Sequence, residues 1–238
     1  MKTIKIAHLY YDLMNLYGEN GNIRFLKKKL EEQGVDVQIH FLTIDDKIDF
    51  NKYDFYYIGT GSEENQRIVL EDLHQYKDDI NNAYQNNKFF LITGNSLELF
   101  GKVIKTNDAD LDGLSIFDFV AQEENFRIVG EQYYQCKLMN KDVLGFQNRI
   151  CTITDTECNL FDVVEGAGST PNSKKEGLYK KNFYGTYLLG PILVRNPYFT
   201  DYLIKQICKQ YDIDYIKPDY NAYCYKAYNE YLKNFYEK

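Results

Sequence analysis

The stretch Lys88–Gly101, KFFLITGNSLELFG, decides the fold. Its apolar run Phe89–Ile92 predicts a buried central strand, Thr93–Asn95 predicts a sharp turn, and Ser96–Phe100 begins a helix. A strand, tight turn and helix in this order form a nucleophile elbow, which presents a reactive side chain at the carboxyl edge of a sheet. The tip of this elbow is Gly94, which has no side chain. The sequence therefore predicts the frame of a covalent enzyme without the atom that would attack.

Around this stretch, strands and helices alternate along the first hundred residues. Strands are expected at Thr3–Leu9, Val35–Phe41 and Asp54–Ile58, with helices from Ile23 to a stop at Gly34 and across Ile68–Tyr76. The alternation indicates an α/β fold with a doubly wound, mostly parallel sheet of flavodoxin-like type. Ligands bind beyond the carboxyl ends of the strands in such sheets. The loops at Tyr10, Gly59 and Gly94 are expected on that edge.

After Gly101 the pattern changes to short strand-like runs separated by turn residues. The expected strands are Leu114–Val120, Phe126–Cys136, Val143–Phe146, Ile150–Ile153 and Leu160–Val164, followed by a loop at Gly166–Lys175 and a hairpin of Gly177–Lys180 with Phe183–Leu188. Two helices are expected at the end of the chain, Asn196–Tyr211 with Asn196 as its cap and Asp219–Tyr236. Since no long linker interrupts the chain, residues 1–238 are expected to form a single domain.

Composition limits the classes of partner. The 238 residues are 44% hydrophobic and 16% aromatic, enough for a large core, and the net charge is −7 without a basic stripe. Nucleic acid and anionic membranes are therefore not expected partners. No apolar stretch approaches the roughly 18 residues of a membrane span. Five scattered cysteines without a CxxC pair favour a reducing cytoplasm.

Few residues offer catalytic chemistry. All three histidines lie in the first third of the chain, and all five cysteines lie at or beyond Cys136, so no cysteine can occupy the elbow. A reversed pair of His8 with Cys151 stays open, as does Ser96 acting as a nucleophile, although a cap of the elbow helix is its simpler role. The sequence contains no His-rich or carboxylate metal pattern, and no cofactor is expected.

A glycine turn after the third expected strand is a candidate binding element. The residues Gly59–Ser62, GTGS, lack the GK[ST] continuation of a phosphate loop. Successive small residues can instead expose backbone N–H groups that hold an oxyanion or a carboxylate. A plain tight turn is the alternative.

Several motifs together resemble one family. In chain order these are LYYDLMNLYGENGNI (Leu9–Ile23), the glycine turn, SLELFG (Ser96–Gly101), EGLYKKNFYGTYLLGPIL (Glu176–Leu193) and NPYFTDYLI (Asn196–Ile204). They are similar to the class I glutamine amidotransferase domain of the cobyric acid synthase type, above all to GatD subunits of lipid II isoglutaminyl synthase. The resemblance implies a glutaminase that passes ammonia to a Mur-ligase-like, ATP-dependent partner of the MurT type. That partner amidates a glutamate of the peptidoglycan stem peptide.

Two catalytic positions of the family differ in this chain. Family members read roughly CGGxQxLG at the elbow and GTYLHGP in the later motif, which places Gly94 at the cysteine and Leu189 at the histidine. The glycine pair after the cysteine falls on Asn95 and Ser96. Loss of a coupled nucleophile and base lowers activity on the order of a millionfold, roughly 8 kcal/mol.

Other positions of the family's glutamine pocket are kept. The resemblance assigns an oxyanion loop to Gly59, Gly61 and Ser62 and a place near the glutamine pocket to Arg127. An exposed strand residue is the alternative for Arg127. Three hypotheses follow: a non-catalytic subunit that stabilises its ligase partner, a sensor that still binds glutamine or another small carboxylate, and an enzyme with a relocated nucleophile.

Overall fold

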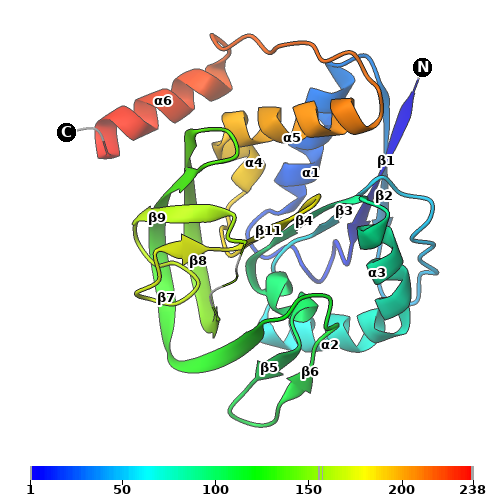
Figure 1. The fold of residues 1–238 in the computed structure, drawn as a ribbon, viewed down its shortest axis with the longest axis vertical. Coiled ribbons are helices and arrows are strands. Elements are labelled where there is room, and N and C mark those ends of the chain that lie inside the picture. The colour runs from blue at the N-terminus through cyan, green and yellow to red at the C-terminus, as the bar shows by residue number, and fades with distance from the viewer. Residues whose placement is uncertain (1, 155, 157, 237–238) are drawn as a thin grey trace.

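A six-stranded sheet forms the centre of the first layer in this computed structural model, which describes residues 2–154, 156 and 158–236 (Figure 1). Its strand order is β11-β12-β4-β3-β1-β2, and every neighbouring pair is parallel except β11 with β12. The bounds are β1 Thr3–Leu9, β2 Asp36–Leu42, β3 Phe55–Ile58, β4 Phe89–Thr93, β11 Leu178–Lys180 and β12 Phe183–Thr186. The elbow strand β4 thus lies near the middle of the sheet, as its apolar sequence predicts.

Helices cover both faces of this sheet. These helices are α1 Asn20–Glu31, α2 Glu63–Leu73, α3 Lys77–Gln85, α4 Ile192–Arg195 and α5 Pro197–Gln210, with 3-10 turns η1 His74–Tyr76 and η2 Gly94–Phe100. The last helix, α6 Tyr223–Phe235, lies apart from this sheet and packs Tyr228 and Leu232 against Leu144. Strand β1 shows the two-sided burial. Ile4 and Ile6 pack in the core cluster of α1 and α5, whereas Ala7 and Leu9 pack in the cluster of α2 and α3. The doubly wound arrangement is therefore confirmed.

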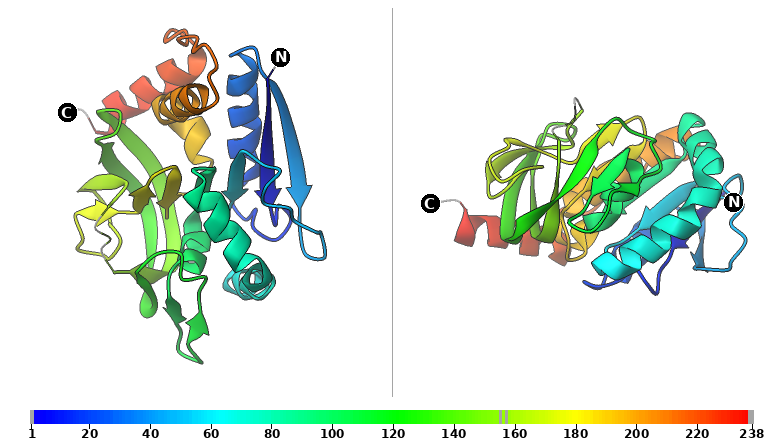
Figure 2. Two further views of the ribbon diagram at one scale, coloured as in Figure 1. Left: turned by 45° about the vertical axis from the view of Figure 1, so that its right-hand side comes forward. Right: turned by 90° about the horizontal axis from the view of Figure 1, so that it is seen from below.

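A second sheet packs beside the first (Figure 2). It contains β5 Val103–Lys105, β6 Leu111–Asp112, β7 Val120–Cys136, β8 Lys141–Ile153, β9 Phe161–Glu165 and β10 Lys175–Glu176, in the order β10-β9-β7-β5-β6 with β8 paired to β7. The long antiparallel hairpin β7–β8 dominates it, and a bridge between Phe146 and Leu189 links β8 to the loop after β12. This bridge brings the second sheet to the carboxyl edge of the first.

Two predictions for this second half are wrong in detail. The expected strand Leu114–Val120 is absent apart from Val120, which begins β7. Backbone N–H groups of Leu114–Phe117 bond instead to carbonyls at the end of η2, among them those of Leu99 and Phe100. Val143–Phe146 and Ile150–Ile153 are one strand, β8. The polar residues between them suggest a turn, but they continue the strand with buried, hydrogen-bonded side chains.

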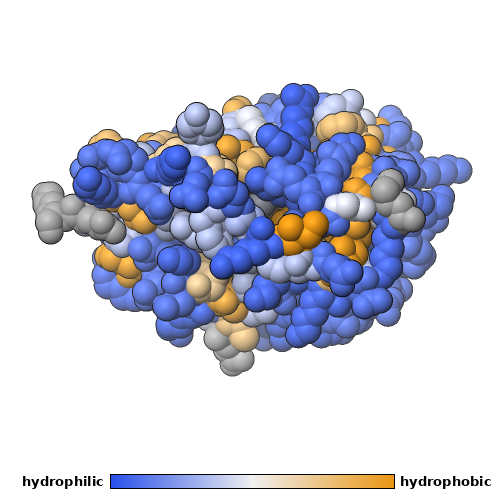
Figure 3. Space-filling model, turned by 90° about the horizontal axis from the view of Figure 1, so that it is seen from above, coloured by the Kyte–Doolittle hydropathy of each residue, from blue (hydrophilic) through white to orange (hydrophobic). Residues whose placement is uncertain are grey.

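Two helix ends and the surface can be compared directly with the sequence. Gly34 closes α1 with φ +76°, a backbone conformation that favours glycine. Asn196 stands at the cap position of α5, yet its side chain bonds to the backbone of Leu144 instead of capping the helix. The face in Figure 3 is mostly hydrophilic, with apolar side chains in separate small groups. No helix in the described part of the chain is long and apolar enough to cross a membrane.

Candidate functional site

The elbow has the backbone that the sequence predicts. Strand β4 ends at Thr93, Gly94 follows with φ +67°, and η2 starts at once. The helix is a 3-10 helix that begins at Gly94, two residues earlier than expected. Left-handed backbone of this kind costs a residue with a side chain about 1–3 kcal/mol at a functional site. Glycine keeps the turn without that cost.

The space in front of Gly94 is filled by two side chains. A Cβ atom built on Gly94 would lie 2.4 Å from both Cβ and Oγ1 of Thr60 and 2.7 Å from Cδ2 of Leu189. Leu189 is 1% exposed, and its backbone N–H donates to the Phe146 carbonyl at 2.8 Å. The structure thus brings Gly94 and Leu189 together, with Thr60 packed beside them. A side chain at the elbow tip has no room unless these neighbours move.

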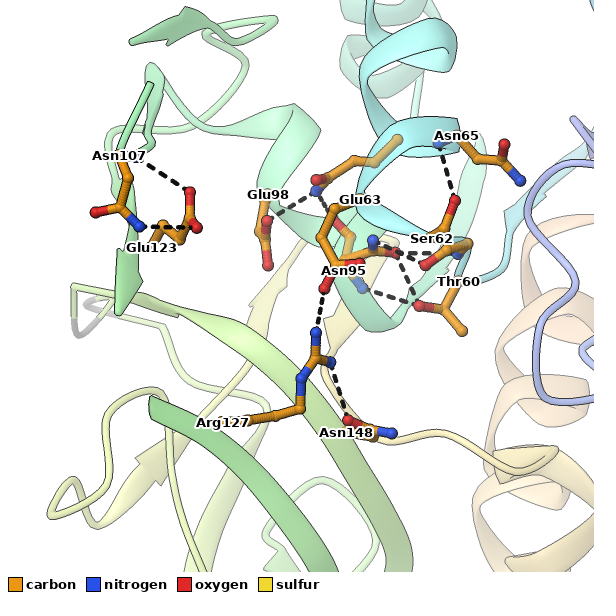
Figure 4. A network of polar contacts seen from close by, with 12 residues as sticks. Thr60, Ser62, Glu63, Asn65, Asn95, Glu98, Asn107, Glu123, Arg127 and Asn148 are labelled. Atoms are coloured by element: carbon orange, nitrogen blue, oxygen red, sulfur yellow. Dashed lines mark hydrogen bonds and ion pairs between the residues drawn. The ribbon is translucent and has the colours of Figure 1, made fainter. Parts of the chain in front are cut away.

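The backbone N–H groups at the positions of an elbow enzyme's oxyanion hole are bonded internally. In an elbow enzyme the N–H after the nucleophile and an N–H from a neighbouring loop hold the oxyanion. Here the Asn95 N–H donates to Thr60 Oγ1 at 3.3 Å, and the Gly61 N–H donates to Asn95 Oδ1 at 3.1 Å (Figure 4). The Thr60 hydroxyl also donates to Asn95 Oδ1 at 2.8 Å. The exposed N–H groups expected of Gly59–Ser62 are therefore not available at Gly61.

The other two residues of the glycine turn have structural positions. A Cβ on Gly59 would lie 2.3 Å from the Met14 carbonyl oxygen, so only glycine fits beneath the first loop. Ser62 is the N-cap of α2, where its side chain accepts from the Asn65 N–H at 3.1 Å. This turn fixes the chain between β3 and α2.

The alternative nucleophiles lie in inert surroundings. Ser96 is fully buried, and its Oγ lies 2.9 Å from the Thr93 carbonyl oxygen and 3.2 Å from that of Ile58. Its expected cap role is wrong, because Ser96 lies inside η2 and bonds to carbonyl groups. Burial raises the pKa of the Cys151 thiol, and the neighbouring Glu98 adds to this. Both effects oppose formation of a thiolate.

His8 lies elsewhere in the fold. It is fully buried on β1, its ring stands 5.0 Å from the Tyr57 ring and 5.7 Å from the Phe41 ring, and neither ring nitrogen has a hydrogen-bond partner among the described residues. Burial lowers the pKa of His8 to about 4. The surroundings of His8 and Cys151 are different, so the structure does not assemble them as a pair.

Arg127 lies at the mouth of the elbow site and is engaged with protein groups. Its guanidinium contacts the carboxylate of Glu63 at 2.6 Å and Oδ1 of Asn148 at 3.0 Å (Figure 4). The Asn148 amide in turn donates to the Tyr17 hydroxyl at 2.6 Å. Residues from four separate segments therefore meet over the elbow. Arg127 already has a carboxylate partner, the side chain of Glu63.

Behind this mouth is a cavity of about 40 Å³, lined by Thr60, Gly61, Gln66, Asn95, Glu98, Arg127, Arg149 and Cys151 among others. One water needs roughly 10–15 Å³ by this measure, so about three waters fit. Glutamine, with ten heavy atoms, does not fit without rearrangement. Within the described residues, no group of three His, Cys, Asp or Glu side chains is placed to hold a metal ion.

Sequence reasoning missed a buried carboxylate under the elbow. Glu19 Oε2 accepts from Thr93 Oγ1 at 2.9 Å, from Asn22 Nδ2 at 3.3 Å and from the Tyr57 hydroxyl. Burial raises the pKa of Glu19. The residue lies within the Leu9–Ile23 motif, and an acid between two glycines, Gly18 and Gly21, was the signal that could have marked it. Glu19 ties the first loop to β3 and β4.

The chain has a doubly wound α/β sheet with a strand–turn–helix elbow at its carboxyl edge. These features place it among the elbow-type α/β proteins, a class that includes amidotransferases and hydrolases. The model of the CobB/CobQ-like glutamine amidotransferase domain matches residues 5–197, and the chain belongs to this family.

Characterised relatives refine that assignment. The chain is 32% identical over 222 residues to the lipid II isoglutaminyl synthase (glutamine-hydrolyzing) subunit GatD of Streptococcus pneumoniae, covering 91% of this chain and 85% of the relative. The Staphylococcus aureus subunit of the same name is 30% identical over 216 residues, with 90% and 88% covered. Among solved structures, a putative ThuA-like protein from Parabacteroides merdae has 13% identity, a TM-score of 0.36 and coverage of 78% and 79%.

Proposed function

We propose that this protein is a non-catalytic, GatD-like subunit that supports a Mur-ligase-like, ATP-dependent partner of the MurT type in amidation of the lipid II glutamate. One observation carries the loss of glutaminase activity. Gly94 and Leu189 meet where a thiol and an imidazole would have to meet, and Thr60 fills the remaining space. With neither nucleophile nor base, the expected loss of activity is on the order of a millionfold.

The internal bonding of the oxyanion donors supports the same proposal. A tetrahedral intermediate would need the N–H groups of Asn95 and Gly61, and Thr60 Oγ1 and Asn95 Oδ1 already accept from them. Preorganised donors of this kind each contribute about 2.7–4 kcal/mol to catalysis. Their internal pairing also argues against a site that senses glutamine through the same donors.

The partner role rests on the relatives. Two GatD subunits of lipid II isoglutaminyl synthase align with about nine-tenths of this chain. We infer that this protein keeps the assembly role while the ligase draws on free ammonia or on another subunit. We further infer that residues 1–238 act as one domain. We also infer a cytoplasmic location, since all five cysteines are unpaired in the structure, as in a reducing compartment.

The test is co-expression with a Mur-ligase-like subunit encoded in the same genome. We expect the two chains to copurify, to release no glutamate from glutamine, and to amidate lipid II when ammonium chloride is supplied. An authentic GatD complex is the positive control for glutamate release. Clear glutamate release would overturn the proposal, and its loss in the S96A or H8A variant would identify a relocated nucleophile. Failure to copurify would remove the partner role.

A further inference from the structure

The cavity behind the elbow holds a carboxylate with a free oxygen. Glu98 on η2 is 1% exposed, and its Oε2 accepts from Gln66 Nε2 at 2.7 Å. Its Oε1 accepts no hydrogen bond of ordinary geometry from the described residues, although Cys151 and Tyr187 lie close enough to lower the pKa of the group. Glu98 lines the cavity directly (Figure 4). A buried carboxylate normally has a partner for each oxygen.

The charges around Glu98 do not balance. The N–H groups of Arg149 on β8 donate to carbonyl and amide oxygens, among them the Gly168 carbonyl at 2.5 Å. Its guanidinium stacks 3.9 Å from the Tyr187 ring centre. A second buried carboxyl group, Glu176 on β10, bonds to Thr186 Oγ1 at 2.8 Å and to the Tyr187 N–H at 2.7 Å.

Neither carboxyl group forms an ion pair within 4 Å among the described residues. At the mouth, Arg127 on β7 and Glu63 on α2 neutralise each other. The buried charges that act on one another here are those of Glu98, Glu176 and Arg149, with one negative charge in excess when both acids are ionised. A buried charge needs either a proton or a counterion.

We propose that the cavity binds a monovalent cation of about the size of water, ammonium or potassium, with Oε1 of Glu98 as its anionic ligand. The volume of about 40 Å³ accepts such an ion with one or two waters. Neutral groups with oxygen atoms, the Gln66 amide and the Thr60 hydroxyl, share the lining. This site is independent of the proposed function, because it uses none of the lost catalytic positions.

A proton is the competing counterion. Burial raises the pKa of Glu98 to about 7 and that of Glu176 to about 7, so both groups can be protonated near neutrality without any ion. A bound cation favours the ionised carboxylate, and an opposite charge within about 4–6 Å lowers the pKa of an acid by about 1–3. The two explanations therefore predict different pKa values for Glu98.

The experiment measures the pKa of Glu98 by carbon NMR of protein labelled at the glutamate carboxyl groups, assigned with E98Q. Titrations are run in choline chloride, ammonium chloride and potassium chloride at one ionic strength. We expect the pKa to fall by about 1–3 in ammonium, in potassium, or in both, relative to choline. The ion that acts at the lower concentration is the natural occupant.

Thallium(I), which substitutes for both ions, supplies a second readout in crystals of the wild-type protein. An anomalous peak in contact with Glu98 Oε1 is expected, and the E64Q variant, which alters an exposed carboxylate of α2 outside the cavity, keeps it. Identical pKa values in all three salts together with no thallium at Glu98 would overturn the proposal in favour of a proton. Because the thallium measurement uses the wild-type chain and needs no signal assignment, it remains decisive even if E98Q does not fold.

Discussion

Substitution of Gly94 by alanine tests whether the elbow is closed to any side chain. The left-handed backbone at φ +67° costs an alanine about 1–2 kcal/mol. The new Cβ would meet Thr60 at 2.4 Å and Leu189 at 2.7 Å, and overpacking of a core costs about 1–3 kcal/mol. We therefore expect G94A to lower the free energy of unfolding by about 2–5 kcal/mol, measured by urea denaturation at constant m-value.

A matched control separates the two contributions. Gly34 has φ +76°, and a Cβ added there would have no atom within 4 Å, so G34A reports the backbone cost alone. The difference between G94A and G34A is then the cost of contact. Thr60 supplies both of the closest atoms at Gly94, its Cβ and its Oγ1.

Removal of Thr60 should relieve that contact. We expect the T60G/G94A double variant to be less destabilised than the sum of its single variants by about 1–3 kcal/mol, the range for residues in direct contact. T60A/G94A should show less relief, since alanine keeps the Cβ atom at 2.4 Å. Costs of G94A and G34A that agree within about 0.5 kcal/mol, or additive effects of T60G and G94A, would refute the view that Thr60 fills the nucleophile's place.

Three further predictions follow from the site. Glu98 and Glu176 have pKa values of about 7 in the fold, above the usual 4.5, so the native state binds more protons between these values. The contribution of each group to the free energy of unfolding should be largest below pH 4.5 and should be lost as the pH rises through 7, by up to about 3 kcal/mol for each group. E98Q should remove the part of this pH dependence that comes from Glu98, measured by urea denaturation at several pH values. Calorimetry with glutamine should give no binding heat, because the cavity of about 40 Å³ is too small and the oxyanion donors are paired; saturable heat would contradict this. Restoring the dyad as G94C/L189H should release no glutamate, whereas the same pair with T60G should show measurable release; activity of the pair alone would mean that Thr60 does not obstruct the site.

The first sheet could be predicted from sequence because its signals are local. Apolar runs followed by glycine turns mark β3 and β4, and each strand lies within a residue of its expected position. The second sheet could not be predicted as well. Gln147 and Arg149 suggested a break in β8, but their polar groups are satisfied by Tyr134, Gly168 and other partners that are distant in sequence. Such pairing depends on the tertiary fold and leaves no periodic pattern.

The same distinction applies to the site. Gly94 and Leu189 stand out because the motifs around them are otherwise preserved, so sequence comparison alone marks both positions. Thr60 does not stand out, since threonine is ordinary in a tight turn and lies far from Gly94 along the chain. Only the fold places its side chain 2.4 Å from the missing Cβ. Glu98 likewise resembles an ordinary helix residue until its burial is known.

Thr60 and Asn95 fill and hydrogen-bond the elbow in a way that the absence of catalytic side chains does not by itself explain. Removal of a cysteine side chain alone would leave a void and two backbone donors without partners, each of which lowers stability. Here Thr60 fills the void, and Thr60 Oγ1 and Asn95 Oδ1 accept from the two donors. The void in front of Gly94 and the two backbone donors are thus filled and paired without glutamine. Under the assembly role proposed above, this edge of the sheet would keep its packing without a bound substrate.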